Sequence, residues 1–218
     1  METNRVNEIK KLIAGDLLSI GAVFLDPDKP FTWASGILSP IYCDNRLTLT
    51  APKVRNDVEN AIAETVKREF PEAEVLMGTS TAGIAHAAIA AHILGMPMGY
   101  VRSGNKDHGR QNRIEGKLEA GQKVVVIEDL ISTAGSAIEV VDALREAGAE
   151  VLGIVSIFTY GMKKGLDRLK EANVKNISLS DFDTTVALAA ETGYIRKEDT
   201  ERLIAFRNDP ADQRWIKR

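Results

Sequence analysis

Cysteine is almost absent from this sequence: Cys43 is the only one among 218 residues. An internal disulfide is therefore excluded, and so is a metal site built on several cysteines. Long apolar runs are also lacking, since no stretch reaches the roughly 20 apolar residues that cross a bilayer. The first residues, 1–11, are polar and contain no apolar core of a signal peptide. We therefore expect a cytoplasmic protein that does not associate with membranes.

The chain also lacks a large excess of either charge. Lysine and arginine number 28 against 31 aspartates and glutamates, a formal net charge of −3. This balance argues against a nucleic-acid partner, because such proteins usually carry a basic surface. Hydrophobic residues make up 44% of the chain, an ordinary proportion for a globular protein. The length predicts a single domain over residues 1–218.

Residues 124–136 form the most informative stretch. Val124–Ile127 are four β-branched residues in a row, which indicates a strand buried on both faces. Glu128 and Asp129 follow, where we expect the carboxyl end of this strand. Small and hydroxyl-bearing residues then fill a turn at 132–136, and a helix is predicted over 137–147. The amide groups of such a turn and the start of the helix can bind a phosphate.

Two carboxylates beside a phosphate repel it unless something lies between them. A ribose diol fits, because its two hydroxyls donate to the two acids, and a metal ion is the other candidate. The stretch therefore predicts a sugar-phosphate site at the carboxyl edge of a parallel sheet. The alternative is an ordinary polar connection between a buried strand and a helix.

This stretch resembles the phosphoribosyl pyrophosphate (PRPP) fingerprint of type I phosphoribosyltransferases. Ala134 stands where many members have glycine, and alanine disfavours a positive φ. The resemblance implies that the acids contact the ribose and that the turn holds the 5′-phosphate. The implied PRPP contacts within the stretch are Glu128, Asp129, Leu130, Ile131, Ser132, Thr133, Ala134, Gly135 and Ser136.

Residues 31–46 contain two β-prone runs around a Ser-Gly turn, which predicts a hairpin. Their pattern, Phe-Thr-x-x-Ser-Gly-x-x-Ser-Pro-x-Tyr-x-Asp-x-Arg, is similar to the N-terminal hood of orotate phosphoribosyltransferases. The resemblance implies a small hood, contributed mainly by residues 1–50, in which Tyr42 and Cys43 contact orotate. It also implies an orotate contact from Ser132 of the turn. Many members have lysine where Ala34 stands, and arginine near Tyr160, so the partner of the orotate carboxylate stays open.

Residues 102–116 are rich in glycine, asparagine and charge, which indicates a loop. The pattern Arg-x-x-x-Lys-Asp-His-Gly resembles the catalytic loop of orotate phosphoribosyltransferases. It implies that Arg102, Lys106 and His108 contact the pyrophosphate, with Ser103 in place of a second lysine found in many members. It also implies a homodimer in which each loop reaches into the partner's site.

Strands and helices alternate along the rest of the chain, which predicts an α/β fold with a parallel sheet and helices on both faces. We expect Thr50 to cap a helix over 51–70, and Ser180 or Asp181 to cap another. The resemblance agrees and implies a type I phosphoribosyltransferase fold. Further strands are expected at 74–77, 98–102, 151–158 and 176–179, and further helices at 4–20, 84–94 and 200–207.

The resemblance implies one activity: transfer of the phosphoribosyl group from PRPP to orotate, giving orotidine 5′-monophosphate and pyrophosphate in pyrimidine biosynthesis. Arg102, Lys106, His108 and Asp129 are the implied catalytic residues. Mg²⁺ is the implied cofactor, held by substrate and water with no site made of side chains alone. Two alternatives are a transferase for a purine base and a regulator that senses PRPP and binds nucleic acid.

Overall fold

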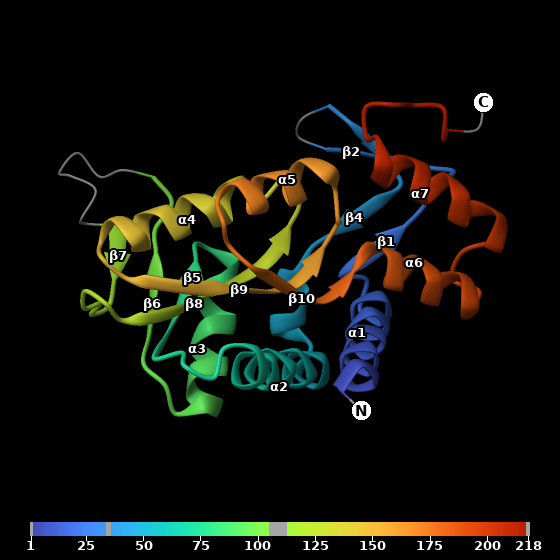
Figure 1. Cartoon of the computed structure of the whole chain (residues 1–218). Coiled ribbons are helices and arrows are strands. Elements are labelled where there is room, and N and C mark those ends of the chain that lie inside the picture. Colours follow the sequence, from blue (N-terminus) through green and yellow to red (C-terminus); the bar gives the residue numbers. More distant parts are fainter. Residues whose placement is uncertain (1, 34–35, 105–112, 217–218) are drawn as a thin grey trace.

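The computed structural model describes residues 2–33, 36–104 and 113–216. Its centre is a six-stranded sheet in the order β10-β9-β8-β5-β6-β7 (Figure 1). Neighbouring strands are parallel, except that β7 runs antiparallel to β6. This confirms the predicted α/β class. The strands are β5 (Val75–Thr79), β6 (Met98–Val101), β7 (Ile114–Glu115), β8 (Lys123–Ile131), β9 (Glu150–Thr159) and β10 (Asn176–Asp181).

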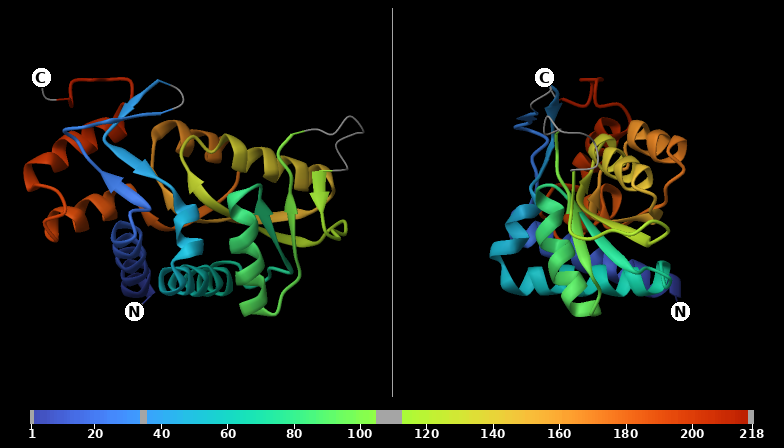
Figure 2. Two further views of the ribbon diagram at one scale, coloured as in Figure 1. Left: turned by 180° about the vertical axis from the view of Figure 1, so that it is seen from behind. Right: turned by 90° about the vertical axis from the view of Figure 1, so that its left-hand side faces the viewer.

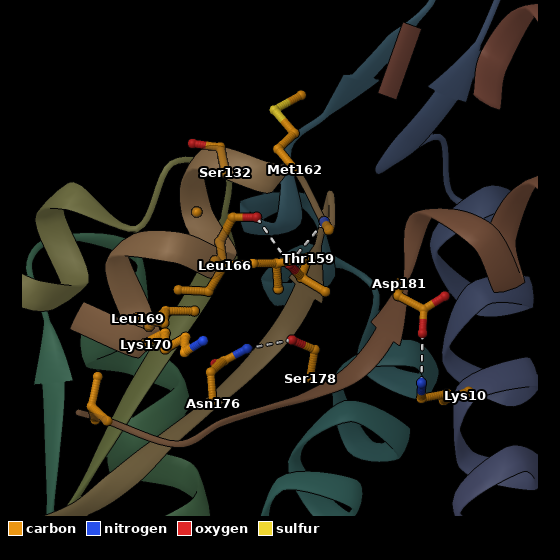
Figure 3. Close-up of a pocket in the computed structure, with 14 residues that line it drawn as sticks. Lys10, Ser132, Thr159, Met162, Leu166, Leu169, Lys170, Asn176, Ser178 and Asp181 are labelled. Atoms are coloured by element: carbon orange, nitrogen blue, oxygen red, sulfur yellow. Dashed lines mark hydrogen bonds and ion pairs between the residues drawn. The ribbon is translucent and has the colours of Figure 1, made fainter. Parts of the chain in front are cut away.

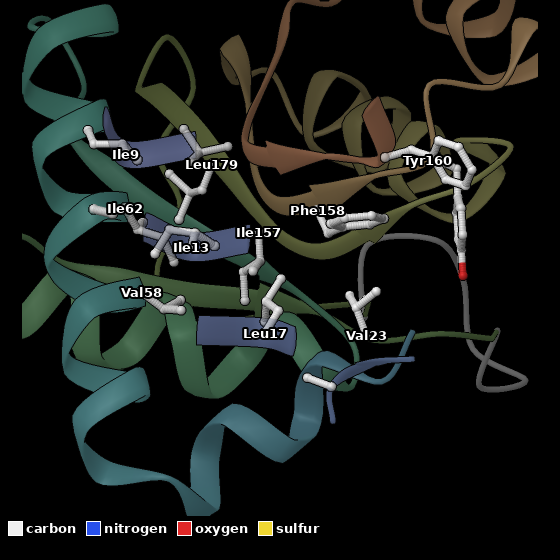
Figure 4. Packing of buried hydrophobic residues seen from close by; sticks show 14 of the residues in the cluster. Ile9, Ile13, Leu17, Val23, Val58, Ile62, Ile157, Phe158, Tyr160 and Leu179 are labelled. Carbon is white, nitrogen blue, oxygen red and sulfur yellow. The ribbon is translucent and has the colours of Figure 1, made fainter. Parts of the chain in front are cut away.

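Helices cover both faces of the sheet (Figure 2). Side chains alternate between the faces of a strand, and β8 shows this directly. Val124 and Val126 join the core beneath α4 (Gly135–Glu146) and α5 (Lys163–Glu171), whereas Val125 and Ile127 join the larger core on the other face. That larger core includes residues of α1 (Glu2–Ser19), α2 (Pro52–Glu69) and α3 (Ala82–Leu94) (Figure 4).

Short elements from both ends of the chain lie together beyond the β10 side of the sheet (Figure 1). The hairpin predicted at 31–46 is present as β2 (Phe31–Thr32) and β3 (Leu38–Ser39), and a second antiparallel pair joins β1 (Val23–Leu25) to β4 (Ile41–Cys43). The remaining elements of the chain are η1 (Asn45–Thr50), which follows the hood strands, and the C-terminal α6 (Phe182–Glu191), η3 (Lys197–Asp199) and α7 (Thr200–Asn208).

Arg202 ties this C-terminal segment to the β1–β2 connection. The buried guanidinium donates to the carbonyl oxygen of Pro27 at 2.6 Å and to the carboxylates of Asp28 and Asp199, each at 2.7 Å. Its Nε donates to the carbonyl oxygen of Trp215 at 2.9 Å. The hood is therefore held, through Pro27 and Asp28, by residues far away in the sequence.

Several predicted boundaries differ from the structure. β8 does not end at Glu128 and Asp129 but continues to Ile131, because its pairing with β9 persists to the register Ile131–Thr159. α4 begins at Gly135 and α3 at Ala82, each two residues earlier than predicted. Thr50 does not cap α2, because its hydroxyl donates inside η1 to Leu47. Asp181 does cap α6 and accepts from the amide of Thr184 at 2.8 Å.

Among the residues described, none of the helices combines the length and the apolar character needed to cross a membrane.

Candidate active site

Three loops meet at the carboxyl edge of the parallel strands. The register pairs Thr79 of β5 with Val101 of β6, and Gly78 of β5 with Ile127 of β8. The turns that follow β5, β6 and β8 therefore leave the sheet side by side. This edge is where ligands bind in open parallel sheets.

Glu128 and Asp129 are neighbouring acids near the end of β8. The Glu128 side chain is buried, and the residue is only 5% exposed. Its Oε1 accepts from the Thr79 hydroxyl at 2.8 Å and from the Asp129 amide at 2.9 Å. Burial, with the nearby Asp129 carboxylate adding to it, raises the pKa of Glu128 to about 8. Near neutral pH Glu128 therefore holds a proton, and the half-buried Asp129 is the more accessible acid of the two.

Asn45 links the hood to this acidic pair. Its side chain is fully buried, and its Nδ2 donates to the carbonyl oxygen of Asp129 at 2.7 Å. The Cys43 thiol donates to the Oδ1 of Asn45 at 3.4 Å. The strand that carries Tyr42 and Cys43 is thus fixed relative to Asp129 through one amide.

The turn after β8 has the form that anion binding requires. Ala134 adopts φ 60° and ψ 6°, the left-handed region, and α4 starts directly at Gly135. Many members of the family that this stretch resembles have glycine here. Because its φ is positive, Ala134 bears a local strain of about 1 kcal/mol. Ser132 and Thr133 are half-buried, and Ser136 is exposed at the first turn of α4. The first amide groups of α4 and its dipole favour a phosphate here.

α5 packs directly against this turn. The Nη1 of Arg168 donates to the carbonyl oxygen of Thr133 at 3.2 Å. Gly165 lies so close that an added Cβ would collide with the carbonyl oxygen of Ser132. The turn is therefore supported from behind by a helix that begins some thirty residues later in the chain.

Glycines also shape the turn after β5. A Cβ on Gly83 would collide with the carbonyl oxygen of Ile127 and the hydroxyl of Thr79, and one on Gly78 would lie 2.9 Å from the carbonyl oxygen of Gly83. α3 can therefore begin immediately beside the strand that carries the acids.

Arg102 stands where the predicted basic loop leaves β6. Its side chain is 24% exposed, and its Nε lies 3.0 Å from the Glu115 carboxylate. Its amide donates to the carbonyl oxygen of Arg113 at 2.9 Å, which closes the base of the β6–β7 connection. Lys106 and His108 lie outside the described residues.

The predicted orotate side is aromatic. The Tyr160 ring is buried and lies 5.5 Å from Trp33 and 5.6 Å from Phe158, measured between ring centroids. Burial raises the pKa of Tyr160 well above its ordinary value, with Cys43 and Tyr42 adding to the effect. The Tyr160 phenol is therefore uncharged. It does not replace the positive charge of the arginine that many members of the resembled family have near this position. Tyr42 is exposed on β4, and its ring lies 5.8 Å from that of Phe31.

The donor set suits a hard cation that keeps its own water. Within the described ranges, no group of three or more histidine, cysteine, aspartate or glutamate side chains could hold a metal ion. Asp129 is half-buried and supplies carboxylate oxygens, whereas Glu128 is buried, protonated and bonded to Thr79. Mg²⁺ prefers oxygen ligands and often binds through one or two carboxylates and substrate phosphates, so Asp129 fits it.

Sequence reasoning identified the acids and the phosphate turn but missed their supports, Thr79, Asn45, Gly165 and Arg168. Thr79 ends a predicted strand at the same edge, and Asn45 follows the hood pattern, so position alone offered a weak signal for both. Gly165 and Arg168 carried none, because they lie on a helix whose packing is set by the tertiary fold.

Comparisons with known proteins agree with this geometry. A family model described as phosphoribosyl transferase domain matches residues 48–190. The orotate phosphoribosyltransferase of Bacillus cereus (strain G9842) is 58% identical over 208 residues, 95% of this chain and 99% of that protein. The solved orotate phosphoribosyltransferase from Aeropyrum pernix matches with a TM-score of 0.72 at 26% identity, over 84% of this chain and 99% of that chain. The UMP synthase of Leishmania donovani matches in fold with a TM-score of 0.77 at 24% identity, over 90% of this chain and 42% of that chain.

Proposed function

This chain belongs to the orotate phosphoribosyltransferase family, and we propose that it transfers the phosphoribosyl group of PRPP to orotate. The products are orotidine 5′-monophosphate and pyrophosphate, a step of pyrimidine biosynthesis. The observation that carries the proposal is the adjacency of Asp129, at the end of β8, to the left-handed turn at Ala134 that opens α4. A single segment of chain thus offers a carboxylate to a sugar and amides to its phosphate.

PRPP binds with its 5′-phosphate against residues 132–136 and its ribose hydroxyls toward the acids. The half-buried Asp129 accepts from a hydroxyl, whereas the buried Glu128 holds a proton in the free protein. Thr79 and Asn45 fix the two acids in place through hydrogen bonds of 2.8 and 2.7 Å. The sugar is therefore oriented before the reaction begins, which lowers the entropic part of the barrier.

In the reaction, the bond between C1 of the ribose and the pyrophosphate oxygen breaks, and N1 of orotate bonds to C1. Negative charge grows on the leaving pyrophosphate, where Arg102, Lys106 and His108 stabilise it. Tyr42, Cys43 and Ser132 contact orotate. When bound, Mg²⁺ would supply positive charge beside the pyrophosphate, held mainly by the substrate and water, with Asp129 as the nearby carboxylate.

The protein acts as a cytoplasmic homodimer in which the loop carrying Lys106 and His108 closes over the partner's site. Closing the loop excludes water, which would otherwise hydrolyse the activated sugar. The support is the position of Arg102 at the base of this loop, at the same sheet edge as the acids.

The test is a direct assay. The protein is mixed with orotate, PRPP and Mg²⁺, and the loss of orotate absorbance is followed against a sample without PRPP. Adenine, hypoxanthine and uracil are then offered as competing bases. We expect orotate to be consumed and the other bases to leave the rate almost unchanged. No loss of orotate, or faster transfer to a purine, would contradict the proposal.

A further inference from the structure

A cavity of about 410 Å³ lies between α5 and the strands β9 and β10, with α1 at its side (Figure 3). Four elements supply most of its polar groups: α1 gives Lys10, α5 gives Lys170, β9 gives Thr159, and β10 gives Asn176, Ser178 and Asp181. Its volume is in the range of sites for small molecules.

This cavity is separate from the reaction site. Thr79, Asp129, Asn45 and Arg102 do not line it. Ile131 and Ser132 are the only residues of the PRPP fingerprint that do. The cavity therefore lies behind the phosphate turn, on the side where α5 packs.

The floor of the cavity is polar where a packed sheet face is normally apolar. The hydroxyls of Ser156 and Ser178 lie 2.7 Å apart, and Asn176 donates to Ser178 at 2.9 Å. Leu166, which faces the cavity from α5, remains 55% exposed. A simple packing void is lined by apolar groups, so this lining is more typical of a site for a hydrogen-bonding ligand.

Positive charge is in excess around the cavity. Lys10 and Asp181 form an ion pair of 2.6 Å, which neutralises both. Lys170 also lines the cavity and forms no ion pair with any residue that the structure describes. Two ammonium groups and one carboxylate line the cavity, so Lys170 supplies the excess positive charge, which favours an anionic ligand.

We propose that this cavity binds a small phosphate monoester, with Lys170 at the phosphate and the Asn176–Ser178 floor at its hydroxyls (Figure 3). The ligand would lie between the sheet and α5, the helix that supports the phosphate turn through Gly165 and Arg168. Occupancy therefore changes the position of α5 and with it the affinity for PRPP. This coupling rests on the proposed function, whereas the binding does not.

Calorimetric titration of the full-length protein with glycerol 3-phosphate tests the binding, with Lys170→Gln as the variant. Lys164→Gln is the matched control, because Lys164 lies on the same helix, is exposed and does not line this cavity. We expect Lys170→Gln to weaken binding at least tenfold and Lys164→Gln to leave it unchanged. Equal binding by the wild type and Lys170→Gln would overturn the proposal. Ser178→Val, which blocks the floor without removing a charge, is expected to weaken binding as well.

Two further arms distinguish the ligand class and the coupling. Inorganic phosphate and succinate are titrated in the same way, and succinate binding as tightly as glycerol 3-phosphate would contradict the choice of a phosphate monoester. In the assay, saturating glycerol 3-phosphate is expected to change the KM for PRPP at least twofold in the wild type and not in Lys170→Gln. An equal change in both would assign the effect to the reaction site. The protein could bind glycerol 3-phosphate in a Lys170-dependent way and yet not consume orotate. That result would contradict the proposed function and support the proposed cavity site.

Discussion

The guanidinium of Arg168 donates to the carbonyl oxygen of Thr133 at 3.2 Å and so joins α5 to the phosphate turn. The next residue in the turn, Ala134, holds the left-handed conformation that glycine adopts at lower cost. The arginine thus holds in place a turn whose own sequence opposes its shape. This pair of residues gives a test of how the phosphate site is preorganised.

We expect Arg168→Ala to raise the KM for PRPP about fivefold, because one hydrogen bond of about 1 kcal/mol is lost. The KM for orotate should change little. Combining it with Ala134→Gly should restore part of the affinity, because glycine removes the strain that Arg168 offsets. Steady-state kinetics of the single and double variants measure this. If the two effects simply add, Arg168 does not act through the turn.

Asp129→Asn should raise the KM for PRPP by about ten- to a hundredfold, since a hydrogen bond to a charged acceptor is worth about 1.5–3 kcal/mol. Asp142→Asn is the control, because Asp142 is an exposed acid on α4. Thermal unfolding should give similar midpoints for the two variants. An unchanged KM in Asp129→Asn with Mg²⁺ present would remove this residue from ribose binding.

Lys106→Ala should lower kcat by about two to three orders of magnitude, as the loss of one charge-stabilising donor typically does. Lys106 is outside the described residues, and this prediction depends on the resemblance of its loop. Lys117→Ala is the control, because the side chain of Lys117 is 85% exposed and pairs with the nearby Glu119 carboxylate at 2.7 Å. Near-normal turnover in Lys106→Ala would exclude a catalytic role.

Stability should depend on pH through Glu128. Its folded-state pKa of about 8 lies above the ordinary value of 4.5, so its contribution is fully present below the unfolded pKa and is lost as pH rises through about 8. The free energy of unfolding should fall by at most about 1.4 kcal/mol per pH unit across this window. Glu128→Gln, which stays neutral, should lack this part of the fall. Denaturant unfolding of the ligand-free protein from about pH 5 to pH 9 measures it, and identical pH profiles would contradict the assignment.

Much of the fold was accessible from the sequence because it depends on local periodicity. The buried strand at Val124–Ile127 and the hairpin at residues 31–46 both follow from apolar and turn patterns, and the structure contains both. The end of β8 was not accessible in this way. Glu128 and Asp129 looked like the end of a strand by polarity, but pairing with β9 keeps them inside it.

The site likewise combines features that a local pattern encodes with features that only the assembled fold creates. Asp129 and the small-residue turn are identifiable from a contiguous pattern, whereas Arg168 and Asn45 reach the turn and the acids from segments 35 and 84 residues away. No local pattern encodes such a contact, because it arises from how α5 and the hood pack on the sheet. The shift in the pKa of Glu128 likewise depends on burial that only the assembled fold creates.

The chain contains only two tryptophans, and both pack against the Phe206 ring, with centroid distances of 5.7 Å for Trp33 and 5.6 Å for Trp215. Trp33 of the hood also lies 5.5 Å from Tyr160, which follows β9. With Trp215→Phe, the intrinsic fluorescence of Trp33 alone becomes an optical signal for hood movement as orotate arrives, and stopped-flow mixing can time that event without an attached dye.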